Sequence, residues 1–269
     1  MIKRNQWFTG GLLIYAVVTV AFYFLFPDFN SGFKQADFVY LIASFFPVAA
    51  VMYALNLYGR KGQHGSALTF MFLSFLTLFV GEALWAIFEF IGLDPYPSAA
   101  DYFYIISYPL LFIGLLKEWR LMKVDWSEVS GFSKLMMSLI TLALAGVVGY
   151  FGLYLAYDAG AGALENFVAM TYGVGDLILL VLAMFVLKMA DEFKGGRLFY
   201  TWFGIFLGLI FTLFADIGFA IYYEPYEEGV FSFNVILDFL WIGSFMAYAY
   251  GFYRMGEIVK SAQDRVLKQ

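Results

Sequence analysis

The sequence predicts an all-α fold: a polytopic membrane bundle of eight transmembrane helices, arranged as two parallel four-helix repeats. Composition is the first reason, since 62% of the 269 residues are hydrophobic and 14% are charged, whereas soluble domains are about 25% charged. The second is a series of eight apolar stretches that approach or exceed the roughly 17–25 residues needed to cross a bilayer. The third is a set of motifs that recurs, in order, in both halves of the chain.

Prolines and polar residues mark where the helices begin and end. The first helix is expected at 7–26, because Pro27 follows and proline lacks the amide hydrogen that a helix interior needs. Ser98 and Asp101 have the spacing of a capping box before the fourth helix. The other helices are expected at 36–59, 67–92, 101–117, 135–157, 167–188, 198–223 and 235–254, and the polar tail could continue the last one.

The basic residues predict the orientation. If the N-terminus is cytoplasmic, every Lys and Arg except Lys34 falls in a cytoplasmic segment, as the positive-inside rule requires. The outer loops are then acidic. We therefore expect a multi-pass protein of the cell membrane with both termini in the cytoplasm.

The internal repeat predicts one membrane domain made of two units, 1–134 and 135–269. Its clearest matches are Gly81-Glu82-Ala-Leu-Trp85 with Ala215-Asp216-Ile-Gly-Phe219, Asp94-Pro-Tyr96 with Glu224-Pro-Tyr226, and Asp101-Tyr-Phe-Tyr104 with Asp238-Phe-Leu-Trp241. A four-helix unit returns the chain to its starting side, so the repeat axis is expected along the membrane normal. The alternative fold is a seven-helix receptor-like bundle with one peripheral helix, the first.

Acidic side chains within the apolar stretches predict a ligand-binding site. Charged groups at membrane depth are costly and mark functional sites by default, and here no Lys or Arg accompanies them. Residues at i, i+3, i+4 and i+7 share a helix face, which groups the acids with aromatic neighbours. The predicted ligand-binding residues are Glu82, Trp85, Glu89, Asp101, Tyr104, Tyr108, Tyr172, Asp176, Asp216, Asp238 and Trp241.

An alternative interpretation is that these acids only hold the helices together. Each would accept hydrogen bonds from Tyr, Trp or Ser on a neighbouring helix, and Asp101 would cap its own helix. Small residues that recur at i, i+4, such as Gly204 with Gly208 and Ala145 with Gly149, are expected to mark close helix packing.

The composition gives little support to an enzymatic function. The chain has no Cys and one His, which removes thiolate catalysis and Cys-based metal sites. The His, His64, falls in a polar loop, so no membrane-embedded serine has a base. We expect no catalytic residue and no metal site, and the sequence names no cofactor.

The acidic motifs resemble those of the multi-helix membrane modules that precede GGDEF-type diguanylate cyclases and some histidine kinases in prokaryotes. The resemblance is carried by Pro97-Ser98-Ala-Ala-Asp101-Tyr-Phe-Tyr104, by Tyr172-Gly-Val-Gly-Asp176-Leu with Gly173 at the family's proline, and by Asp216-x-x-Phe219 and Asp238-x-x-Trp241. It implies a membrane sensory or input module. The sequence departs from the pattern in showing no output domain after its last helix.

The expected function is therefore a membrane sensory module with an outward-facing acidic and aromatic pocket. Its expected partners are the lipid bilayer, a small cationic or amphipathic ligand and a separate cytoplasmic signalling protein. Nucleic acid is not expected, because the basic residues are scattered over short loops. The alternatives are a small transporter or a cation- or proton-coupled carrier, and then a structural membrane scaffold.

Overall fold

The structure, a computed structural model, is all-helical over the residues that it describes: 2–26, 36–122, 127, 129–192 and 197–266. The helices are α1 (Ile2–Leu25), α2 (Ala36–Tyr58), α3 (Gly62–Phe90), α4 (Ala99–Leu121), α5 (Gly131–Val147), α6 (Ala163–Glu192), α7 (Arg197–Ile221), α8 (Tyr223–Glu227) and α9 (Phe231–Val266). A π-helical stretch, η2 (Val148–Leu155), continues α5. Pro27 and Lys34, used above for a helix boundary and for the orientation, lie outside the described residues.

Eight of the described helices are long and apolar enough to cross a membrane. Their outward surfaces support that assignment, because large apolar side chains such as Leu13, Val17 and Phe24 on α1 and Leu142 and Tyr154 on the α5–η2 segment are exposed. Apolar patches of this extent are rare on soluble monomers and are typical of surfaces that meet lipid or another protein.

Most helix boundaries differ from the prediction by a few residues; α1, for example, begins at Ile2 rather than at 7. The start of α3 has a clear local cause, and the last helix continues through the polar tail as the sequence allowed. The α3 helix begins at Gly62 rather than at 67, because Gly59 and Gly62 both adopt positive φ values (80° and 84°) and turn the chain within a few residues. The α9 helix runs on to Val266 through the polar tail. Glu257 and Ser261 stay buried on this extension, and Tyr53 of α2 donates a hydrogen bond to Glu257 (2.5 Å).

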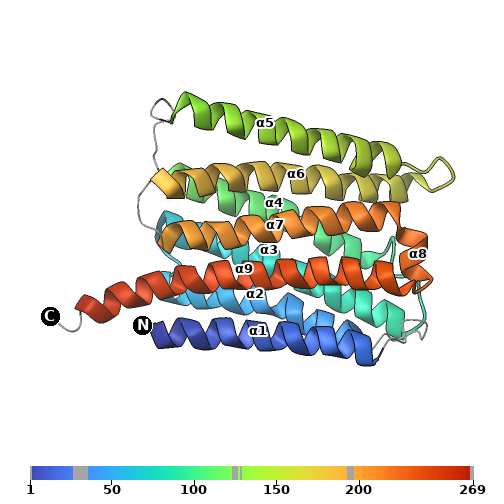
Figure 1. Cartoon of the computed structure of the whole chain (residues 1–269), viewed down its shortest axis with the longest axis horizontal. Helices are drawn as coiled ribbons and strands as arrows, with labels where there is room; N and C mark the ends of the chain where they lie inside the picture. Colours follow the sequence, from blue (N-terminus) through green and yellow to red (C-terminus); the bar gives the residue numbers. More distant parts are fainter. Residues whose placement is uncertain (1, 27–35, 123–126, 128, 193–196, 267–269) are drawn as a thin grey trace.

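Six helices pack as a closed ring in the order α2, α3, α4, α6, α7, α9 and back to α2. Figure 1 shows α1 and α5 at opposite edges of the bundle. The start of α1 and the end of α9 lie at one end, here called the terminal end, and α8 lies at the other, the distal end. The turn at 91–98, which joins α3 to α4, is also distal. The six helices of the ring therefore run side by side between the terminal and the distal end.

Small residues allow the closest helix approach, between α7 and α9. A Cβ atom on Gly251 would lie 2.7 Å from the Thr201 carbonyl oxygen, and one on Gly204 would lie 3.0 Å from the Ala247 carbonyl oxygen. The predicted packing role of Gly204 and Gly208 is thus confirmed. The same prediction is wrong for Gly149, where an added Cβ would meet nothing within 4 Å, because η2 packs at the edge of the bundle.

Candidate ligand-binding cavity

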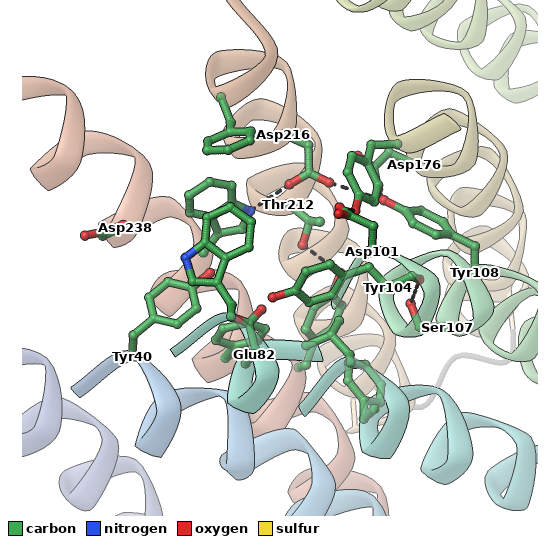
Figure 2. A pocket seen from close by; sticks show the side chains of 18 of the residues that line it. Tyr40, Glu82, Asp101, Tyr104, Ser107, Tyr108, Asp176, Thr212, Asp216 and Asp238 are labelled. Atoms are coloured by element: carbon green, nitrogen blue, oxygen red, sulfur yellow. Dashed lines mark hydrogen bonds between the residues drawn. The ribbon is translucent and has the colours of Figure 1, made fainter. Parts of the chain in front are cut away.

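A cavity of about 130 Å³ occupies the distal half of the helix ring. Figure 2 shows side chains that converge on it from opposite sides, with Asp176 and Tyr108 on one side and Tyr40 and Asp238 on the other. The structure brings all but one of the predicted residues to this cavity: Glu82, Trp85, Asp101, Tyr104, Tyr108, Tyr172, Asp176, Asp216, Asp238 and Trp241. No Lys, Arg or His is found among its described lining residues.

Glu89 is the predicted residue that does not line the cavity. It lies two turns beyond Glu82 on α3, is buried, and accepts a hydrogen bond from the Trp85 indole nitrogen to its Oε1 (3.1 Å). Trp85 therefore lines the cavity, while its indole nitrogen is occupied by the hydrogen bond to Glu89. Seven residues of helix rise about 10 Å along its axis, so Glu89 lies nearer the distal end than Glu82 and outside the cavity lining.

Asp176 on α6 and Asp216 on α7 share one hydroxyl donor at the centre of the cavity. The Tyr108 hydroxyl lies 2.9 Å from Asp176 Oδ1 and 3.2 Å from Asp216 Oδ2. Gly175 admits the Tyr108 ring, because a Cβ there would lie 2.5 Å from Tyr108 Cδ1. Trp241 donates its indole hydrogen to Asp216 Oδ1 (2.7 Å). The Asp176 and Asp216 carboxyls are also hydrogen-bonded to each other, and the second oxygen of Asp176, Oδ2, is buried and receives no donor from any other residue.

Asp238 on α9 is held differently, because tyrosine hydroxyls satisfy both of its oxygens. Tyr226 donates to Oδ1 (2.8 Å) and Tyr23 of α1 donates to Oδ2 (2.7 Å). Burial, and the negative charge of Asp238 beside it, raise the pKa of Tyr226 well above its usual range, so this hydroxyl keeps its proton and remains a donor. Asp238 thereby ties α1 and α8 to α9.

Asp101 forms the predicted capping box at the start of α4. The Ser98 amide donates to Asp101 Oδ2 (2.6 Å), and the Ser98 hydroxyl accepts from the Ala100 amide (3.0 Å). Tyr172 of α6 donates to the other oxygen, Asp101 Oδ1. Asp101 therefore caps its helix, as the alternative interpretation held, and also joins α4 to α6.

Glu82 stands on α3, across the ring from Asp216. Its carboxyl is hydrogen-bonded to the Tyr104 hydroxyl, and Asp216 and Asp238 are its nearest charged neighbours. Gly81 makes room for this tyrosine, because a Cβ at that position would lie 2.5 Å from Tyr104 Cε1. Glu82 and Asp216 are enclosed by protein yet keep part of their surface accessible, because that surface faces the cavity.

Several lining residues were missed by the sequence reasoning, among them Tyr23, Tyr40, Thr212, Phe219, Tyr226 and Tyr248. The sequence could have identified two of them. Thr212 precedes Asp216 by four residues and Tyr248 follows Trp241 by seven, so each shares a helix face with a predicted residue. Tyr23 and Tyr40 lie on helices for which the sequence predicted no site residue. Only the packing of α1 and α2 against α9 brings them to the site.

Aromatic rings form a layer between the cavity and the distal end. The Phe219 ring lies one turn beyond Asp216 and contacts the rings of Trp85, Tyr96, Tyr223, Tyr226 and Trp241, with centroids 5.3–5.8 Å apart. Tyr96 and Tyr226, from the two distal connections, are both buried. A ligand that arrives from the distal side must displace or pass this layer.

On the terminal side, a packed apolar layer lies beneath the cavity. Met71, Phe75, Leu115, Ile205 and Phe252 are at most 1% exposed and belong to the main hydrophobic core. Polar groups reappear only beyond it, where the buried Glu118 pairs with His64 and Tyr53 bonds Glu257. The cavity is therefore polar at its walls and apolar at its floor.

The chemistry available to this cavity is the binding of positive charge. No group of three or more His, Cys, Asp or Glu side chains among the described residues is arranged to hold a metal ion. The acids instead stand singly or in a pair, each beside aromatic rings and hydroxyls. Such rings attract cations through their negative faces.

No family model matches this chain, and neither a curated protein nor a solved structure matches it. The resemblance to membrane input modules therefore rests on the motif residues themselves.

Proposed function

We propose that this protein is a membrane sensory module that binds a small cationic ligand in the distal cavity and passes the signal to a separate cytoplasmic partner. The observation that carries the proposal is that five carboxylates line one cavity of about 130 Å³, with no basic side chain among its described lining residues. Carboxylates without a basic partner are costly to bury. A bound cation would relieve that cost.

The hydrogen bonds that each acid makes support this proposal more closely than the number of acids does. Asp101 and Asp238 receive donors at both oxygens, so they need no ligand. Asp176 and Asp216 differ, because they share the single hydroxyl hydrogen of Tyr108 and are hydrogen-bonded to each other. Two adjacent buried carboxyls repel each other when both are charged, so a cation beside Asp216, which keeps part of its surface accessible, would relieve that repulsion.

The proposed arrangement in the membrane is two parallel four-helix repeats with both termini cytoplasmic. The order of the ring supports the repeat: α2 with α3 corresponds to α6 with α7, α3 with α4 to α7 with α9, and α4 with α6 to α9 with α2. The repeat-equivalent acids Glu82 and Asp216 line the same cavity. The exposed basic residues Arg60, Lys61 and Arg120 at the terminal end support a cytoplasmic orientation of that end.

The second candidate is a small carrier for the same kind of cation. The polar pairs of His64 with Glu118 and of Tyr53 with Glu257 favour it, because they lie on the far side of the bundle from the cavity. The apolar layer between them favours the sensory function, since transport would require that layer to open. Uptake of a radiolabelled cation into proteoliposomes distinguishes the two: a sensor gives none, and a carrier gives time-dependent accumulation.

The proposed function is tested by thermal unfolding of the full chain with and without small organic cations. A ligand that binds only the folded state stabilises it by about 2.7 kcal/mol at 100 times its dissociation constant, which a melting curve resolves. Asp216→Asn keeps the shape of the side chain and removes its charge, so it should abolish the cation-dependent shift.

The matched control is Glu228→Gln, which removes one negative charge from an exposed side chain at the same end of the bundle. This variant should keep the full shift. The proposal is overturned if no cation stabilises the wild-type chain, or if Asp216→Asn and Glu228→Gln respond alike.

A further inference from the structure

We propose that α1 is a lever on the outside of the helix ring. A hydrogen bond from Tyr23 to Asp238 holds its distal end, and release of that bond moves the last part of α9, residues 257–266, here called the α9 extension. The lever itself does not depend on the function proposed above, and its use as the output of a sensor rests on that function. The packing of α1, its two contacts with α9 and its hydrogen bond to α2 carry the proposal.

The α1 helix lies outside the ring and is held by few side chains. Among the described residues it packs only against α2 and α9, and Figure 1 shows it at one edge of the bundle. Thr19 and Tyr23 are the only buried residues among the α1 side chains that the structure describes. Segments with few buried contacts open at the lowest free energy, so α1 can be displaced more readily than a helix of the ring.

At its distal end, α1 reaches the cavity through one side chain. Tyr23 is 1% exposed, lines the cavity and donates a hydrogen bond to Asp238 Oδ2 (2.7 Å). Its ring packs edge to face on Phe239 of α9, with centroids 5.0 Å apart. A change of charge or of donors at Asp238 therefore changes how firmly the cavity wall holds α1.

At its terminal end, α1 is joined to the α9 extension by a stack of aromatic rings. The Phe8 ring stacks on that of Tyr253 of α9, with centroids 3.8 Å apart. Tyr253 stacks in turn on Tyr53 of α2 (5.4 Å). The Tyr53 hydroxyl donates to Glu257 Oε1, where the α9 extension begins. A movement of Phe8 therefore disturbs the contacts that fix the extension.

A hydrogen bond to α2 holds α1 between these two contacts. The Tyr15 hydroxyl donates to the Val39 carbonyl oxygen, and the Tyr15 ring packs edge to face on Phe46 (4.7 Å). Tyr15 lies seven residues from Phe8 and eight from Tyr23, which is about 11 Å of helix on either side. A stiff helix that is held near its middle and released at one end tilts, so its other end moves as well.

The alternative path runs within α9, which carries both Asp238 and Glu257. This helix is enclosed between α2 and α7. A Cβ on Gly251 would lie 2.7 Å from the Thr201 carbonyl oxygen of α7, so the backbones of α7 and α9 are already in close contact. Displacement of α9 would break that contact, whereas a tilt of α1 leaves the ring intact.

Two variants that remove a donor from the same acid test the lever. Tyr23→Phe removes the hydroxyl that serves Asp238 Oδ2, and Tyr226→Phe removes the one that serves Oδ1. The chemical loss is matched, and only the helix that is released differs, because Tyr226 belongs to α8. Tyr226→Phe is therefore the control for a general loss of stability.

Spin labels on the full chain in nanodiscs report the movement, since the chain has no native cysteine. One pair, Gln6→Cys with Gln63→Cys, measures the position of α1 relative to the ring. A second pair, Gln63→Cys with Asp264→Cys, measures the position of the α9 extension. All three side chains are exposed at the terminal end.

Tyr23→Phe should add a second distance to both pairs, because loss of the hydrogen bond should raise the population of the tilted state about fivefold or more. Tyr226→Phe should leave both distance distributions as they are in the wild type. The proposal is overturned if Tyr23→Phe leaves either distribution unchanged, or if Tyr226→Phe alters them to the same extent.

Phe8→Leu tests the terminal end and keeps the hydrogen bond of Tyr23. It removes the ring that stacks on Tyr253, so it should broaden the distance distribution of the α9 extension. If Tyr23→Phe does not fold, this variant decides, and an unchanged extension distance refutes the lever. None of these measurements needs a cation. Their failure leaves a cation-dependent thermal shift standing, and the absence of that shift leaves the lever standing.

Discussion

At the scale of single residues, the buried carboxylates fall into two kinds. Asp238 and Asp101 are satisfied by hydroxyl and amide donors and join helices, which is what the packing interpretation of the sequence expects. Asp176 and Asp216 instead share one tyrosine hydroxyl and are hydrogen-bonded to each other. The same residue type thus serves two purposes, and its hydrogen-bond partners decide which.

Removal of one hydroxyl from Asp238 should lower stability. Tyr226→Phe leaves the buried Asp238 Oδ1 without its donor, and an unsatisfied buried acceptor of this kind costs about 1–3 kcal/mol. The melting temperature should fall while the proposed response to cations persists, because both oxygens of Asp238 are already hydrogen-bonded within the protein. The control is Tyr154→Phe, at a side chain that is 71% exposed, which should leave the melting temperature unchanged. Equal melting of the two variants would contradict the role given to this hydrogen bond.

At the scale of elements, glycines set which helices approach each other. Gly204 and Gly251 bring α7 against α9, Gly175 admits Tyr108 towards α6, and Gly81 admits Tyr104 towards α3. The last two contacts place the hydroxyls that serve Asp176 and Glu82. Helix packing and the polar site are therefore specified by the same small residues.

Gly251→Ala should destabilise the α7–α9 contact. The added methyl group would meet the Thr201 carbonyl oxygen at 2.7 Å and the Ile205 amide nitrogen at 3.1 Å, and backbone atoms yield less readily than the end of a side chain. Overpacking costs about 1–3 kcal/mol, more than the gain in helix propensity from Gly to Ala of about 1 kcal/mol. Gly10→Ala, where nothing lies within 4 Å, should be neutral or stabilising in the same unfolding measurement. A Gly251→Ala chain as stable as the wild type would refute the close contact.

At the scale of the whole molecule, polar and apolar layers alternate along the bundle axis. An aromatic layer around Phe219 lies distal to the cavity, a packed apolar layer lies beneath it, and the Glu118 and Glu257 contacts lie at the terminal end. Because the apolar layer separates the polar regions, the proposed sensor would have to transmit its signal from the cavity by helix displacement.

Cysteine labelling tests the orientation of the bundle, since the chain has no native cysteine. Gln63→Cys at the terminal end and Ser232→Cys at the distal end are both exposed positions. In intact cells, a membrane-impermeant maleimide should label the second variant and should label the first only after permeabilisation. The unsubstituted chain, which has no cysteine, is the negative control for both variants. Labelling of both variants from one side would refute the crossing pattern, and the reverse result would refute the cytoplasmic placement of the termini.

The sequence by itself determined the eight crossing helices and most of the acids and aromatics that line the cavity. The length of an apolar stretch indicates directly whether it can span a membrane. A spacing of three, four or seven residues indicates that two residues share a helix face. Only the tertiary structure determines which groups donate hydrogen bonds to each acid. Tyr23 reaches Asp238 from α1, and Tyr108 lies between Asp176 and Asp216 from α4, because helix rotation and crossing place them there. Spacing within one helix carries no information on the rotation of its neighbour, and for that reason the pairing of Asp176 with Asp216 is visible only in the folded chain.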